Sequence, residues 1–203
     1  MRARWLGLAL AACTAAAGVA AQSLPLGKPL PGMVRTVPDV AVRNPGFETG
    51  PLAGRACPTG WDCIMHAASD SFRFFYDDAH PAAGAHSGCF ESVGHEPWGK
   101  MVQGHPVGDA LRGKRVRLSA VVRLENVTGE GAGPILLAQG GSGNEVAYRF
   151  EPRAGSEGWH AVSAELDVPQ STYLLELGFA LRGKGRLCVD EVRFEVLPGR
   201  PAV

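Results

Sequence analysis

The sequence predicts an all-β protein, a two-sheet antiparallel sandwich of the jelly-roll type. Apolar and polar residues alternate with period two in six stretches, which is the pattern of strands with one buried and one solvated face. Clusters of Gly, Pro and Asn separate these stretches, and no window of about a dozen residues keeps a helical stripe. Short strands divided by turn residues are typical of sandwiches and jelly rolls.

The alternating stretches define the expected strands in chain order. They cover 72–76, 116–124, 146–150, 162–168, 173–181 and 186–196. The turn residues between them predict turns at 129–133, 140–144, 152–158, 169–172 and 183–185.

The last stretch, 186–196, keeps its apolar residues on one side only if its register slips once, at Asp190 and Glu191. A β-bulge supplies such an extra residue, bends the strand and re-aims nearby side chains. We therefore expect a bulge in this closing strand.

Residues 1–21 have the pattern of a secretory signal peptide. Arg2 and Arg4 precede a nearly unbroken apolar run, and small residues at 19–21 offer a cleavage site, which argues against a retained membrane span. The alternative is a lipoprotein of the outer membrane, because residues 10–13 resemble a lipobox with Cys13 as the lipid anchor. Either way the sequence predicts a secreted or periplasmic protein.

The rest of the chain predicts one domain. Residues 22–39 contain four prolines and indicate an extended tether, 40–198 form the sandwich, and 199–203 are a tail.

Removal of Arg2 and Arg4 leaves 18 basic and 20 acidic residues, a net charge of −2. This balance excludes an electrostatic case for nucleic-acid binding.

Four cysteines remain after cleavage: Cys57, Cys63, Cys89 and Cys188. An even number in an exported chain predicts two disulfides, although three pairings are possible. Cys57 and Cys63 flank a short turn and most simply close on each other, in which case Cys89 pairs with Cys188. The chain has no C-x-x-C pair, which disfavours a zinc site.

The sequence contains no signature of a serine hydrolase, zinc protease, P-loop or dinucleotide-binding enzyme. Asp77, Asp78 and His80 could hold a metal, and a carboxylate pair could cut a glycosidic bond. We interpret all of these as surface-loop residues.

Several segments, in order, resemble carbohydrate-binding modules of the fourth and ninth families, which are galactose-binding-like jelly rolls. They are Asn44–Glu48 (N-P-G-F-E), Gly60–Trp61, His86–Gly88, Gln103, Gly113–Ala120, Gly158–Trp159 and Val189–Val192 (V-D-E-V). The resemblance spans about 41–197. It implies a non-catalytic module that binds poly- or oligosaccharide outside the cell or at its envelope. The alternatives are a structural or protein-interaction envelope module without sugar affinity and a glycoside-active hydrolase.

The resemblance also implies a structural calcium ion where the opening and closing strands meet. Glu48 and Asp190 would supply carboxylates, and backbone carbonyls around Asn44 would complete the oxygen shell. The alternative is that Asp190 and Glu191 bond only to backbone at the bulge.

Sugar binding needs a flat aromatic surface and planar polar groups. The candidates are Trp98, Tyr76, Tyr148, Gln139, Asn144 and Arg149. Trp61 and Trp159 match family positions that are usually packed, so we expect both in the core. Arg115, Arg117 and Arg123 share one strand face and could favour acidic glycans, or could pair with carboxylates on a neighbouring strand.

Overall fold

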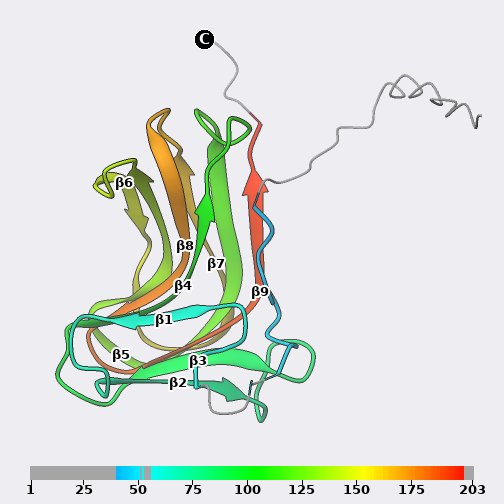
Figure 1. Cartoon of the computed structure of the whole chain (residues 1–203). Coiled ribbons are helices and arrows are strands. Elements are labelled where there is room, and N and C mark those ends of the chain that lie inside the picture. The colour runs from blue at the N-terminus through cyan, green and yellow to red at the C-terminus, as the bar shows by residue number, and fades with distance from the viewer. Residues whose placement is uncertain (1–39, 51, 53–55, 199–203) are drawn as a thin grey trace, which may run out of the picture. The chain divides into compact units, whose positions relative to one another are not determined.

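The computed structural model describes residues 40–50, 52 and 56–198 (Figure 1). The predicted signal peptide (1–21), the alternative lipid anchor at Cys13, the tether (22–39) and the tail (199–203) lie outside these residues. Within the described part of the chain, no helix has the length and apolarity to cross a bilayer.

Nine strands run through the described residues, and every pairing is antiparallel. They are β1 (Asp62–Met65), β2 (Phe72–Asp77), β3 (Ser87–Ser92), β4 (Trp98–Pro106), β5 (Arg115–Gly140), β6 (Glu145–Phe150), β7 (Arg153–Asp167), β8 (Thr172–Arg182) and β9 (Arg186–Val196). They form one hydrogen-bonded network in the order β1-β4-β8-β5-β9-β3-β2, and β6 and β7 each pair with β5 as well. Because β5 is shared, we describe the network as two sheets: the first contains β2, β3, β9, β7 and the first half of β5, and the second contains β1, β4, β8, β6 and the second half of β5. The predicted antiparallel jelly-roll sandwich is confirmed.

Strand β5 belongs to both sheets, because its first half pairs with β7 and β9 and its second half with β6 and β8. Figure 1 shows it bending as it passes between them. The predicted turn at 129–133 is therefore wrong. Gly129 and Gly131 have φ of 80° and 108°, which glycine adopts without strain, so the chain bends here while pairing with β8 begins at Gly131.

The predicted turn at 152–158 is also wrong, because β7 begins at Arg153. Its first residues are exposed and include glycines, a composition that is also typical of turns. Period-two alternation did not indicate β1, β3 or β4. In β3 the first four residues are all buried, so the two faces of the strand do not differ in polarity.

The bulge in β9 is confirmed. Two residues of β5, Ser119 and Val121, lie opposite Arg193 and Asp190 of β9, so β9 holds one extra residue. Glu191, inside this bulge, has a left-handed φ of 49°. The next residue, Val192, donates its N–H to the carbonyl of Pro45 at 2.9 Å, which ties the closing strand to the opening segment.

Phe47 of the opening segment anchors that segment in the core. Its side chain is fully buried and stacks on Trp61, with ring centroids 5.5 Å apart. Asn44 holds the loop that precedes it, because its side-chain amide donates to the carbonyls of Thr49 and Thr59. The expected burial of Trp61 in the core is thereby confirmed.

We expect Gly88→Ala to destabilise the protein by about 1–3 kcal/mol, the usual cost of overpacking a core. A Cβ at Gly88 would lie 2.2 Å from the buried ring of Phe47. Urea unfolding measures the loss, and Gly158→Ala is the control because a Cβ there meets nothing within 4 Å. Equal stability of the two variants would contradict the close packing of Phe47 on β3.

His105 makes the fold sensitive to acid. Its imidazole is buried and its Nε2 has no hydrogen-bond partner among the described residues. Burial, and secondly the charge of Arg43, lower the pKa of His105. The unfolded chain therefore takes up this proton at higher pH than the folded protein, so stability is lost as pH falls below about 6.5.

Melting temperatures at about pH 7.5 and 5.5 test this effect in the wild type and in His105→Leu. We expect the wild type to lose more stability on acidification than the variant. An identical loss in both proteins would show that other groups cause it.

Candidate functional site

The outward side of the second sheet carries a cleft, which we call the cleft face. Inward residues of its strands, such as Met101, Leu177 and Leu136, belong to the main core, so their neighbours along each strand point outward. The cleft has a volume of about 130 Å³. It is lined by Trp98, Lys100, Ile135, Leu137, Glu145, Tyr148, Glu176, Ala180 and Arg182.

The floor of the cleft is apolar although it lies on an outward face. Val102, Ile135 and Ala180 form a buried cluster separate from the main core, and Tyr148 and Phe150 of β6 pack against it. Gly178 lies between Val102 and Ile135 in the register, and a Cβ there would come 2.2 Å from the backbone oxygen of Met101. A covered apolar cluster with aromatic rings at its border is typical of a ligand site.

Paired charges surround this floor. The Lys100 ammonium lies 2.6 Å from a carboxylate oxygen of Glu176, and both side chains are largely buried. Arg182 donates to the Tyr148 hydroxyl at 2.8 Å and to Glu130 at 3.2 Å. The cleft therefore presents donors and acceptors in fixed positions.

Arg182 also covers the aromatic rings of β6. Its guanidinium carbon lies 5.0 Å from the Phe150 centroid and 5.5 Å from that of Tyr148. Burial raises the pKa of the Tyr148 hydroxyl, which keeps it protonated at neutral pH. Tyr148 can thus both donate and accept a hydrogen bond.

The structure brings Trp98 and Tyr148 together in the cleft, while the other predicted sugar-binding residues do not line it. Gln139 lies at the end of the cleft, opposite the lining residue Glu145 in the register, and Asn144 lies in the hairpin turn, where it accepts a hydrogen bond from Ser142. Arg149 is on the opposite side of β6 from Tyr148 and pairs with Glu151.

Tyr76 lies in the other sheet, on β2. Its hydroxyl accepts from the Thr59 N–H at 2.8 Å and donates to the Thr49 carbonyl at 2.7 Å. Through these two hydrogen bonds Tyr76 stabilises the segments that carry Thr49 and Thr59.

Sequence reasoning missed Lys100, Glu176 and Arg182. One signal for Glu176 was present, because it interrupts the apolar run 174–181 of β8. A carboxylate in a largely buried strand needs a partner, and here the partner is Lys100, 76 residues away in the sequence.

The two predicted calcium ligands already accept backbone hydrogen bonds. Asp190 accepts from the N–H groups of Ala82, Ala83 and Glu191 at 2.7–3.0 Å. Burial raises the pKa of Asp190 in spite of these bonds.

Glu48 accepts in the same way from Ala85 and His86. The Asn44 carbonyl, proposed to complete the shell, accepts from Phe47 and from the Trp61 indole. Because N–H groups face these oxygens, the residues as arranged do not fit a calcium ion, which needs about 6–8 free oxygen ligands.

The calcium ion that the sequence led us to expect can be tested with a chelator. We expect the melting temperature to be unchanged by EDTA, since backbone N–H groups already satisfy both carboxylates. Calcium added back in excess after chelation is the control. A fall of several degrees that calcium reverses would establish the ion.

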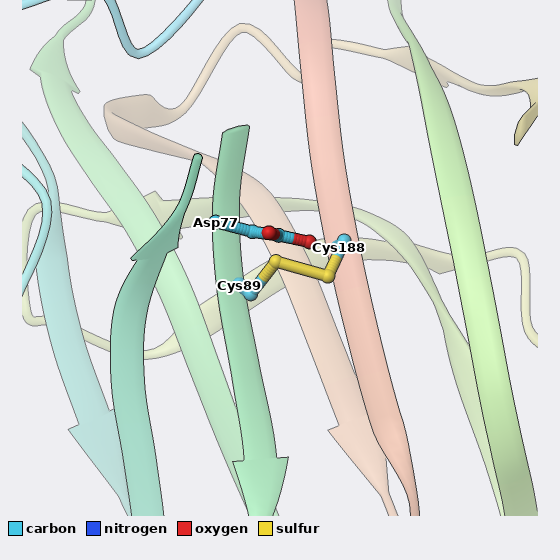
Figure 2. A group of neighbouring side chains, drawn as sticks. All are labelled: Asp77, Cys89 and Cys188. Carbon is cyan, nitrogen blue, oxygen red and sulfur yellow. A yellow bond between two sulfur atoms is a disulfide. The ribbon is translucent and has the colours of Figure 1, made fainter. Parts of the chain in front are cut away.

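Asp77, Cys89 and Cys188 form a group of potential metal ligands in the first sheet, with atoms within 4.8 Å of one another. Figure 2 shows that the two cysteines, on neighbouring strands, are joined by a disulfide, so their sulfurs are not free thiolates. Asp77 instead binds Arg123 at 2.6 Å, and this bond, though opposed by partial burial, contributes to a lowered pKa of Asp77. The group is therefore an ion pair between Asp77 and Arg123 that lies next to the disulfide, and not a metal site.

The arginines of β5 pair with carboxylates, as the second sequence interpretation expected. Arg115 and Arg117 both bind Glu165 of β7, at 2.8 and 2.6 Å. Arg123 also lies over the ring of Trp159, at 5.4 Å from its centroid. Trp159 is half-buried beneath this arginine and outside the main core, so its expected place in the core is wrong.

No family model and no curated protein matches this chain. Comparison with solved structures assigns its fold to the jelly-roll sandwiches that include carbohydrate-binding modules.

Three similar structures illustrate this fold. The CBM22-1 xylan-binding domain of Xyn10C from Paenibacillus barcinonensis has 15% identity and a TM-score of 0.51, over 76% of this chain and 92% of that one. A family 16 carbohydrate-binding module has 12% identity and a TM-score of 0.53, over 76% and 98%. The enzymatically active domain of tailspike protein 4 from bacteriophage CBA120 has 15% identity and a TM-score of 0.55, over 77% of this chain. This chain spans only 21% of the tailspike chain. At such identities the likeness establishes the fold alone.

Proposed function

We propose that this protein binds carbohydrate without cutting it, and that the cleft face is the binding site. The observation that carries the proposal is the convergence of Trp98 and Tyr148 with paired polar groups on one open sheet face. Sugar rings have apolar faces that pack on aromatic side chains, and hydroxyl rims that need donors and acceptors at fixed positions.

The pairing of Lys100 with Glu176 suits a hydroxyl-rich ligand. An ammonium donates and a carboxylate accepts, so adjacent hydroxyls of one sugar could bond to both groups. Since the two charges neutralise each other, the pair needs no charged ligand. One of the structural neighbours is a xylan-binding domain, which supports a polysaccharide as the ligand class.

We further propose that the protein acts outside the cytoplasm, secreted or periplasmic. The signal-peptide pattern of 1–21 supports export, and so do the two disulfides, which persist in oxidising compartments. Lipid attachment at Cys13 is the alternative processing. Intact-mass measurement of the exported protein separates a start near residue 22 from a lipidated Cys13.

Retention on insoluble polysaccharides tests the main proposal. Purified protein is incubated with a panel of neutral and acidic glycans, and the bound fraction is measured against a protein that does not bind them. We expect retention on at least one polysaccharide and no release of reducing sugar. Absence of retention on every glycan would favour the structural or protein-interaction module.

A glycoside-active hydrolase is the second candidate, favoured by the likeness to an enzymatically active tailspike domain. It would release sugar from an oligosaccharide panel. Within the cleft, Glu176 is engaged by Lys100, which supports binding over catalysis.

A further inference from the structure

We infer that His66 and Glu96 are positioning residues for Trp98, holding its indole at the border of the cleft. This role rests on the proposed function, in which Trp98 is the main aromatic surface for the sugar. His66 directly follows β1, and Glu96 precedes Trp98 by two residues, so both lie in the loops that lead into this corner of the sheet.

His66 contacts Trp98 through both its backbone and its ring. Its N–H donates to the Trp98 carbonyl at 3.3 Å, one step beyond the last pair of the β1–β4 ladder. Its imidazole meets the indole edge to face, with centroids 5.8 Å apart and an interplanar angle of 74°. This arrangement is one of the favoured geometries of aromatic pairs.

Glu96 fixes the imidazole through its Nδ1. One carboxylate oxygen lies 2.7 Å from His66 Nδ1, and the other accepts the Ala68 N–H at 3.0 Å. The Ala68 N–H and, secondly, His66 lower the pKa of Glu96. The carboxylate therefore joins the 66–68 loop to the segment before β4.

A ligand that stacks on a fixed indole does not have to order it, and such preorganisation raises affinity. Immobilising one side chain is worth about a 2- to 10-fold change in affinity. Trp98 also lies beside the Lys100 ammonium, 5.9 Å from the ring centroid, so its orientation affects the polar groups of the cleft.

The test uses protein labelled with 5-fluorotryptophan, in which fluorine NMR reports each indole. The Trp98 resonance is assigned by its loss in Trp98→Phe. In Glu96→Gln we expect this resonance to shift or broaden, while those of Trp61 and Trp159 stay unchanged. The dissociation constant for the retained polysaccharide should rise about 2- to 10-fold at an unchanged melting temperature.

The matched control is Asp70→Asn, which removes an exposed carboxylate from the same loop and should change neither readout. Adding Glu96→Gln to His66→Gln should add little to the effect of His66→Gln alone, since the two residues act through one contact. An unchanged Trp98 resonance in Glu96→Gln would overturn the inference. A shifted resonance in a protein that retains no glycan would support the positioning role and overturn the proposed function.

Discussion

Replacing Trp98 with alanine is expected to abolish most polysaccharide retention while leaving the protein folded. Central aromatic residues of binding sites cost about 2 kcal/mol or more on truncation, which corresponds to about a 30-fold weaker dissociation constant. Trp98 lines the cleft at the start of β4 and contributes to no core cluster, so its removal should affect binding more than stability. Affinity electrophoresis in gels containing the retained glycan measures the loss.

Tyr173→Ala is the matched control for Trp98→Ala. Tyr173 is an exposed aromatic residue of β8 that does not line the cleft. Its truncation should leave retention at the wild-type level. Equal retention by wild type and Trp98→Ala would remove the cleft face as the binding site, whatever the glycan.

The sequence predicted the strands in which one face is buried and the other is solvated. In the first half of β5 the two faces differ in burial, so alternation marked this strand. In β9 residues 187–190 are all buried, and the apolar residues on either side of the bulge marked this strand instead. In the second half of β5, residues 131–136 are all buried, and no alternation remains. Glycines in the bend then looked like a turn.

The loss of alternation and the cleft have the same physical cause. Val102 and Ile135 point outward yet are buried by the apolar cluster of the cleft face. A strand with apolar residues on both sides carries no period-two signal. The strands that the sequence did not predict, β4 and the second half of β5, are thus among those that build the candidate site.

Trp98 became a sugar-binding candidate because Trp61 and Trp159 match family positions that are usually packed, and Tyr148 because of its aromatic side chain; that they bind sugar stays a prediction. Arg149 and Tyr76 could not be excluded in the same way, because their side of the strand depends on register and sheet order. The contact of Arg182 with Tyr148 likewise requires β8 and β6 to flank β5, an arrangement that one sequence does not specify.

The second large effect is expected from removal of the disulfide between Cys89 and Cys188. The structure has both predicted bridges, and this one joins residues 99 apart in the sequence. Its cysteines face each other across the β3–β9 pair, with Cα atoms 4.1 Å apart. By the loop-entropy argument, the double variant Cys89→Ala/Cys188→Ala should lose about 4–5 kcal/mol of stability.

The position of the Cys89–Cys188 bridge explains why its removal should cost so much stability. Strand β9 lies between β5 and β3, so it connects the edge hairpin β2–β3 to the rest of the first sheet. Figure 2 shows Asp77 beside the bridge, and Arg123, which binds Asp77, also contacts the Cys188 sulfur at 3.6 Å. Both sulfur-bearing residues are at most 1% exposed, so alanine substitution, not mild reduction, is the appropriate perturbation.

Cys57→Ala/Cys63→Ala is the comparison, because it removes the bridge with a separation of only 6 residues. The same argument assigns this short loop about 2 kcal/mol, roughly half of the effect of the long one. Urea unfolding of both double variants measures the difference. Equal losses would mean that strain or residual structure in the unfolded chain, and not loop length, governs how β9 is held against β3.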